Sequence, residues 1–103
     1  MPLLQISAQN LQQRLQNGEQ LNLLDVREII EYHTYNIGGI NIPLSKLETN
    51  FKHIAYNKTS EIIVICSAGI RSVTAQNILT ANGYQNIVNL TGGLKALQKL
   101  NIR

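Results

Sequence analysis

Cysteine is nearly absent from this chain, which contains only Cys66. A single cysteine cannot form an internal disulfide or a cysteine-rich metal site, and it suits a compartment where thiols stay reduced. Tryptophan is absent and phenylalanine occurs once, so the chain lacks the aromatic platforms on which single-stranded nucleic acid stacks. No apolar run approaches the ~20 residues that span a bilayer. We therefore expect no metal, no nucleic-acid partner and no membrane partner.

The charged residues are few and spread along the chain, with a small excess of cations. Nine lysines and arginines against six acidic residues give a net charge of +3. Because the cations do not cluster, the charge favours attraction of small anions over binding of nucleic acid. Residues 1–6 lack the basic region and long apolar stretch of a signal peptide, so we expect a cytoplasmic protein.

Apolar strand-like stretches alternate with helix-like stretches along all 103 residues. The strand candidates are short and mostly apolar, and they cover residues 3–6, 21–26, 40–42, 61–65 and 86–90. The helix candidates cover residues 8–16, 27–35, 44–51 and 72–81, with a last helix after Gly92 and Gly93. This alternation predicts one α/β domain over residues 1–103, with a mostly parallel central sheet of about five strands and helices on both faces.

The helix predicted over residues 27–35 carries two side-chain expectations. Ile30 is expected on the apolar face of this helix. Arg27 and Glu31 are four residues apart on another face, where they are expected to form a helical ion pair. Asp25, at the end of the preceding strand, is expected to accept hydrogen bonds from neighbouring loop amides or to cap the next helix, and to help hold the site as a structural residue.

The only cysteine lies where an apolar strand ends and a helix begins. In a parallel sheet, ligands bind at the carboxyl ends of the strands, so this position favours a functional site. Unpaired amides at a helix start, together with the helix dipole, stabilise an anion, and a cysteine there loses its proton more easily. Gly69 allows the loop to curl tightly, and Arg71 adds a permanent positive charge. The residues of this loop are Cys66, Ser67, Ala68, Gly69, Ile70, Arg71 and Ser72.

The loop resembles the active-site loop of the rhodanese family of sulfurtransferases. Three further segments resemble motifs of the family in the same order: residues 24–28 with Glu31, residues 36–43, and residues 88–93. The resemblance covers essentially the whole chain and implies a stand-alone single-domain rhodanese. It implies that Cys66 takes a sulfane sulfur from thiosulfate or a persulfide and passes it to a thiol or cyanide.

The resemblance also assigns roles within the loop and identifies partners. The amides of residues 67–72 would hold the transferred sulfur, and Arg71 would attract the anionic donor. Asp25 and Arg27 would be structural residues beside the site. No cofactor is expected, and a sulfur-relay protein is a further candidate partner. Because Arg71 is the only cation of the loop, a persulfide donor suits the loop better than the dianion thiosulfate.

Two other functions remain open from the sequence. Phosphate-binding cysteine loops place five residues between Cys and Arg, whereas four intervene between Cys66 and Arg71, so the cradle is small for a phosphatase or an arsenate reductase. The second alternative is a catalytically silent rhodanese fold that serves as a binding or regulatory module. An intact nucleophile loop argues against that reading.

Overall fold

The computed structural model describes residues 3–100 as five strands and five α-helices in alternation. The strands are β1 (Leu4–Ile6), β2 (Leu23–Asp25), β3 (Ile40–Asn41), β4 (Ile62–Ile65) and β5 (Ile87–Leu90). The helices are α1 (Ala8–Gln16), α2 (Ile29–Thr34), α3 (Leu47–Asn50), α4 (Arg71–Ala81) and α5 (Gly93–Lys99). Two 3-10 turns, Leu44–Lys46 and Phe51–His53, flank α3. Residues 1–2 and 101–103 lie outside the described residues. Two expectations include some of them: the one for a signal peptide, made from residues 1–6, and the one for a domain over residues 1–103.

All strand pairs in the sheet are parallel, and the strand order is β1-β5-β4-β2-β3. The α/β fold expected from the alternating pattern is therefore confirmed. The central strand β4 is buried along its whole length, which explains its uninterrupted apolar sequence. Its carboxyl end leads directly to Cys66, so the loop of residues 66–72 lies at the middle of the sheet's active edge.

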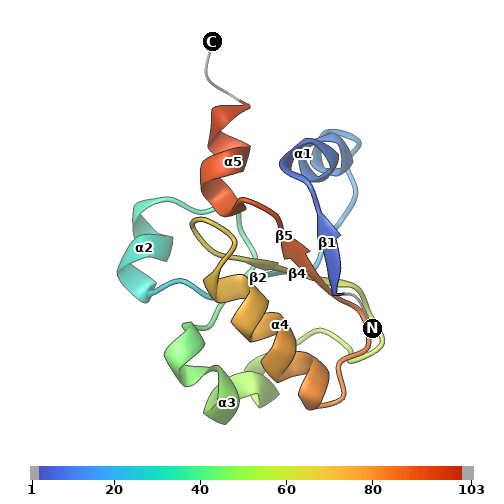
Figure 1. Cartoon of the computed structure of the whole chain (residues 1–103), viewed down its shortest axis with the longest axis vertical. Helices are drawn as coiled ribbons and strands as arrows, with labels where there is room; N and C mark the ends of the chain where they lie inside the picture. Colours follow the sequence, from blue (N-terminus) through green and yellow to red (C-terminus); the bar gives the residue numbers. More distant parts are fainter. Residues whose placement is uncertain (1–2, 101–103) are drawn as a thin grey trace.

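Helices cover both faces of the sheet, as Figure 1 shows. One buried cluster joins α3 and α4 to the face that carries Ile62 and Val64, and the other joins α1 and α5 to the face that carries Ile63 and Ile65. Alternate residues of β4 thus point to opposite faces, as the period of a strand requires. The same alternation places Asn89 of β5 on the α4 side.

Local signals in the sequence set several helix boundaries correctly. Ser7 caps α1, since its hydroxyl oxygen accepts a hydrogen bond of 3.1 Å from the amide of Asn10. Leu94 and Leu97 are buried on the inner face of α5, and Leu47 is buried beneath α4.

None of the helices among residues 3–100 combines the length and the apolar character that a bilayer span requires.

Two predictions around the second and third helices are wrong. Helix α2 begins at Ile29 rather than at Arg27 and has no buried residue, and Ile30 is 76% exposed. The helix has only six residues, and none of them belongs to either buried cluster. The helix expected over residues 44–51 is instead one α-helical turn between two 3-10 turns.

Candidate active site

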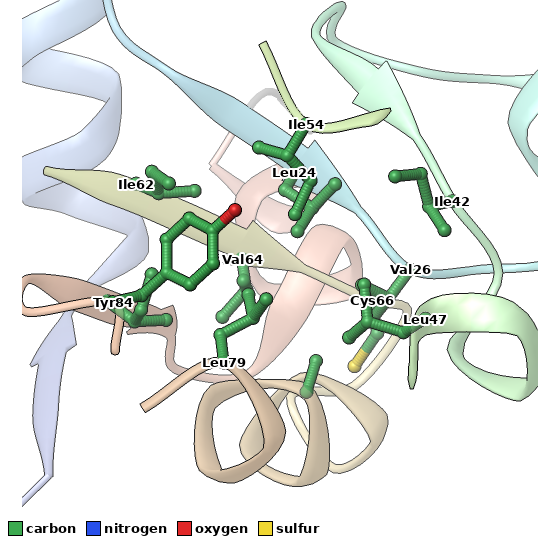
Figure 2. Close-up of a cluster of buried hydrophobic side chains, with 12 residues drawn as sticks. Leu24, Val26, Ile42, Leu47, Ile54, Ile62, Val64, Cys66, Leu79 and Tyr84 are labelled. Atoms are coloured by element: carbon green, nitrogen blue, oxygen red, sulfur yellow. The ribbon is translucent and has the colours of Figure 1, made fainter. Parts of the chain in front are cut away.

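The side chain of Cys66 lies at the carboxyl end of β4 and is almost fully buried, with 1% of its surface exposed. Figure 2 shows it beside Val26 and Leu47, with the sulfur turned toward α4. Burial among apolar neighbours would favour a neutral, inert thiol. The hydrogen bonds of the sulfur therefore decide what this cysteine can do.

Backbone amides of the loop are directed at the Cys66 sulfur. The amide of Gly69 donates to Sγ over 3.0 Å and the amide of Ser72 over 3.4 Å. Gly69 has φ +87°, and a Cβ at this residue would lie 2.9 Å from the amide nitrogen of Gly92. Glycine is required here, because both the backbone angle and the close packing exclude a side chain. The loop therefore forms a cradle of amides around the sulfur.

These contacts lower the pKa of the Cys66 thiol. Burial raises the pKa, but hydrogen bonds from the Ser72 hydroxyl and from the amides of Ser72, Gly69 and Ala68 outweigh that effect. The net pKa lies below the ordinary value of a thiol. The site thus stabilises a thiolate without a separate general base.

Ser72 connects the sulfur to a buried asparagine that the sequence analysis did not single out. The Ser72 hydroxyl lies 3.3 Å from the Cys66 sulfur and also donates a hydrogen bond to Oδ1 of Asn89. Nδ2 of Asn89 lies 3.5 Å from the Gly69 carbonyl, which orients the amide. All three side chains are buried. A hydroxyl has one proton, so Ser72 can donate either to Asn89 or to a Cys66 thiolate, but not to both.

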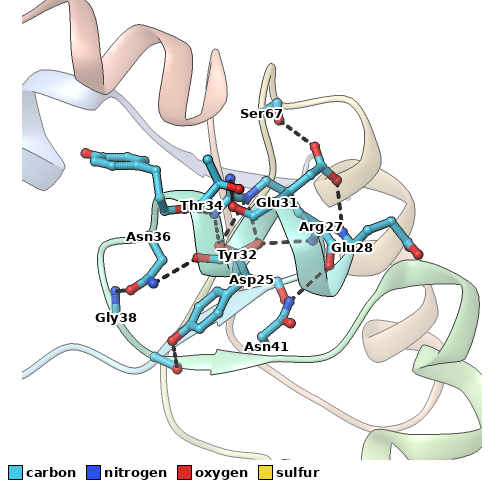
Figure 3. A network of polar contacts seen from close by, with 12 residues as sticks. Asp25, Arg27, Glu28, Glu31, Tyr32, Thr34, Asn36, Gly38, Asn41 and Ser67 are labelled. Atoms are coloured by element: carbon cyan, nitrogen blue, oxygen red, sulfur yellow. Dashed lines mark hydrogen bonds and ion pairs between the residues drawn. The ribbon is translucent and has the colours of Figure 1, made fainter.

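Arg71 forms a bidentate ion pair with Glu31 of α2, with N–O distances of 2.7 and 3.0 Å. The same guanidinium donates to the Ser67 hydroxyl over 3.1 Å, and that hydroxyl donates to Glu31 over 3.3 Å. Figure 3 shows Glu31 turned toward Ser67. The Arg71 guanidinium holds the pKa of Glu31 at about 2, and Glu31 raises the pKa of Arg71.

The expected ion pair between Arg27 and Glu31 is wrong. Arg27 precedes α2, and its guanidinium binds Asp25 over 2.7 Å in a pair that is almost fully buried. The same guanidinium donates to the carbonyl of Glu31 within α2 and to the carbonyl of Tyr35 just after it. Asp25 also accepts from the Arg27 amide, as expected for a residue that ends a strand. The pair therefore anchors α2, which in turn presents Glu31 to the cysteine loop.

The start of α5 packs directly on the backbone of the cysteine loop. The amide of Leu94 donates to the Cys66 carbonyl and that of Lys95 to the Ser67 carbonyl, each over 2.9 Å. A Cβ at Gly93 would lie 2.5 Å from both carbonyl oxygens, so glycine is needed for this approach. Among residues 3–100, no group of three His, Cys, Asp or Glu side chains is placed to hold a metal ion.

The comparison with protein families agrees with this geometry. The model of the rhodanese-like domain matches residues 7–100. The chain belongs to the rhodanese-like family. A putative sulfur carrier protein from Bacillus subtilis, YrkF, is 35% identical to this rhodanese domain over 92 residues, which cover 88% of this chain and 49% of YrkF. The chain thus spans about half the length of that relative.

Other relatives match the rhodanese domain over more of their own length. A putative mitochondrial thiosulfate sulfurtransferase from Schizosaccharomyces pombe is 36% identical over 95 residues, covering 81% of this chain and 67% of the relative. The crystal structure of a rhodanese-related protein from Thermoplasma volcanium superposes with a TM-score of 0.80 at 30% identity, covering 97% of this chain and 95% of the other. Relatives of the chain are thus named sulfur carrier or sulfurtransferase.

Proposed function

We propose that this rhodanese domain transfers a sulfane sulfur through a persulfide on Cys66. The observation that carries the proposal is the pair of amides, from Gly69 and Ser72, that point at the sulfur of the only cysteine. A thiolate held this way is a nucleophile for covalent catalysis in two steps. The names of the relatives, sulfur carrier and sulfurtransferase, support the same chemistry.

In the first step, the Cys66 thiolate attacks the outer sulfur of the donor. An S–S bond to Cys66 forms, the donor's own bond to that sulfur breaks, and its electron pair leaves with the donor as sulfite or as a thiolate. In the second step, an acceptor thiolate or cyanide attacks the outer sulfur, and the electron pair of the broken bond returns to Cys66. The persulfide places the outer sulfur ~2 Å beyond Sγ, toward the amides of residues 67–72.

The state of Arg71 favours a persulfide donor over thiosulfate. Its guanidinium is neutralised by Glu31 and also bonded to Ser67, so little of its charge is free to attract a dianion. The nucleophile must remain reduced between turnovers, so we expect the domain to act where thiols are kept reduced. A sulfur-relay protein and a small thiol are both compatible acceptors.

The proposal is tested by mass spectrometry of the whole chain after incubation with thiosulfate, inorganic polysulfide or cysteine persulfide. We expect a mass increase of one sulfur atom, removed by cyanide with release of thiocyanate. Cys66→Ser is the matched control, because it keeps the side chain's size and removes the nucleophile. If no donor loads the wild-type chain, the catalytic proposal fails and the binding-module alternative replaces it. Turnover of a chromogenic phosphate ester would instead favour a phosphatase.

A further inference from the structure

A pocket of about 320 Å³ lies beside the cysteine loop, between α2 and α5. Its lining reaches the loop at Ser67, the neighbour of the nucleophile, and the pocket is open to solvent on its outer side. A molecule bound there would lie between the two helices and against Ser67, next to the cysteine in the chain. The side chains of the pocket that matter for this argument are Ile30, Tyr35, Lys95 and Gln98.

The charges around the pocket leave one group uncompensated. Arg27 and Glu31 line the pocket, but Arg27 is paired with Asp25 and Glu31 with Arg71. Lys95 is exposed, and its ammonium has no hydrogen bond or ion pair to any residue between 3 and 100. The pocket therefore presents a net positive charge to a ligand.

The neutral groups of the pocket complete a site for a small amphipathic anion. The Tyr35 hydroxyl and the Gln98 amide, like Lys95, have no partner within the described part of the chain and can donate hydrogen bonds. Ile30, which is 76% exposed, supplies apolar surface beside them. An apolar wall with a few polar donors and one charge is typical of a site for a small molecule.

We propose that this pocket binds the anionic end of a low-molecular-weight thiol that exchanges sulfur with Cys66, with a carboxylate against Lys95 and the alkyl stem on Ile30. The inference rests on the proposed function and names its substrate class. The thiolate of the bound acceptor attacks the outer sulfur of the Cys66 persulfide. The bond between that sulfur and Sγ breaks, Cys66 takes the electron pair as a thiolate, and the acceptor leaves as a persulfide.

The test uses three thiols of similar size: 3-mercaptopropionate, 2-mercaptoethanol and cysteamine, which are anionic, neutral and cationic at their far ends. The whole chain is first loaded with sulfur, and the discharge rate by each thiol is measured in wild type, Lys95→Met and Lys95→Glu. The ratio of variant to wild-type rate for each thiol cancels the thiol's own reactivity. Lys99→Glu is the matched control, since Lys99 is exposed on the same helix and does not line the pocket.

We expect Lys95→Met to lower the preference for 3-mercaptopropionate over 2-mercaptoethanol by about two- to fivefold, as for an exposed ion pair. Lys95→Glu should shift the preference toward cysteamine, and added salt should reduce both effects. Equal rate changes for all three thiols would overturn the inference. An equal effect of Lys99→Glu would also overturn it, because it would indicate the overall charge of the protein rather than this pocket.

A second readout separates this inference from the proposed function. Iodoacetate and iodoacetamide alkylate the same thiolate and differ mainly in the negative charge of iodoacetate. We expect Lys95→Met to slow alkylation of Cys66 by iodoacetate relative to iodoacetamide, whether or not the chain transfers sulfur. An unchanged ratio would reject the anion site. If the ratio changes but no donor loads Cys66, the anion site is supported and the sulfur-transfer proposal fails.

Discussion

The Ser72 hydroxyl faces both the Cys66 sulfur and Asn89, and its replacement should change the acidity of the nucleophile. Ser72→Ala removes a hydrogen bond to the thiolate while the Ser72 amide stays in place. A hydrogen bond to a charged group contributes about 1.5–3 kcal/mol, and one pKa unit corresponds to ~1.4 kcal/mol. Giving up the bond to Asn89 costs the hydroxyl about 0.5–1.5 kcal/mol of this gain, so we expect the pKa of Cys66 to rise by about 1 unit.

Replacing Asn89 should shift the same pKa in the opposite direction. The Ser72 hydroxyl must leave Asn89 before it can donate to the thiolate, so Asn89 competes with the charged form of Cys66. Asn89→Leu removes this competitor and keeps the number and branching of the side-chain heavy atoms. A neutral hydrogen bond contributes about 0.5–1.5 kcal/mol, so we expect the pKa of Cys66 to fall by about 0.4–1 units.

Both shifts are measured from the pH dependence of iodoacetamide alkylation, and the signal has a single source because Cys66 is the only cysteine. Other charges around the sulfur stay the same in every variant: Arg71 on α4, Glu31 on α2, and the buried pair of Asp25 and Arg27. Ser67→Ala is the matched control, since the Ser67 hydroxyl binds Glu31 and Arg71 rather than the sulfur. Thermal unfolding confirms that each variant is folded.

The double variant decides whether Asn89 acts through Ser72. In a Ser72→Ala background, Asn89→Leu should leave the pKa of Cys66 unchanged, because the shared hydroxyl is gone. The reasoning is refuted if Ser72→Ala does not raise the pKa, or if Asn89→Leu raises it to the same degree. A rise in the pKa with Asn89→Leu would mean that Asn89 acts through its hydrogen bond to the Gly69 carbonyl, which maintains the shape of the loop.

Two further predictions concern the loop and its ion pair. Gly69→Ala should lower the free energy of unfolding in urea by about 1–3 kcal/mol and abolish persulfide formation, because the φ of +87° and the close packing exclude a side chain. Unchanged loading of Cys66 with sulfur would contradict the role of the cradle. The Glu31 carboxylate has a folded pKa of about 2, below its ordinary 4.5, so its pair with Arg71 contributes stability above pH 4.5 that is lost as the pH falls toward 2. Glu31→Gln should remove that part of the acid dependence of Tm, whereas Glu48→Gln, at an exposed residue, should not.

The cysteine loop could be predicted because its signals are local in the sequence. The apolar run of β4, the cysteine after it, Gly69 and Arg71 lie within ten residues, and the strand-to-helix order determines where they sit on the sheet. The signals for the Ser7 cap and for the buried face of α5 are equally local. Each depends on spacing along one element.

The ion pairs could not be predicted from the helical spacing rule. Arg27 and Glu31 have the right separation, but Arg27 precedes α2, where Glu31 accepts from the Glu28 amide over 2.9 Å. The spacing of Glu28 and Glu31 was the signal that the helix starts after residue 28. Arg71 is 40 residues from Glu31, and only the fold brings them together.

The sequence signal for Asn89 is weaker than the signal for the cysteine loop. Its position shows how a residue of the sheet acts on the hydrogen bonding of the nucleophile. It is the one polar residue in the otherwise apolar strand β5, and the strand's alternation directs it to the face that α4 covers. A buried asparagine there needs a partner, and Ser72 on the first turn of α4 provides it. The sulfur is therefore bonded by the loop amides and by a hydroxyl whose other partner belongs to the sheet. Arg71, the only cation of the loop, is paired with Glu31 and holds α2 against the loop, and the hydrogen bonds that lower the pKa of Cys66 come from the amides and Ser72.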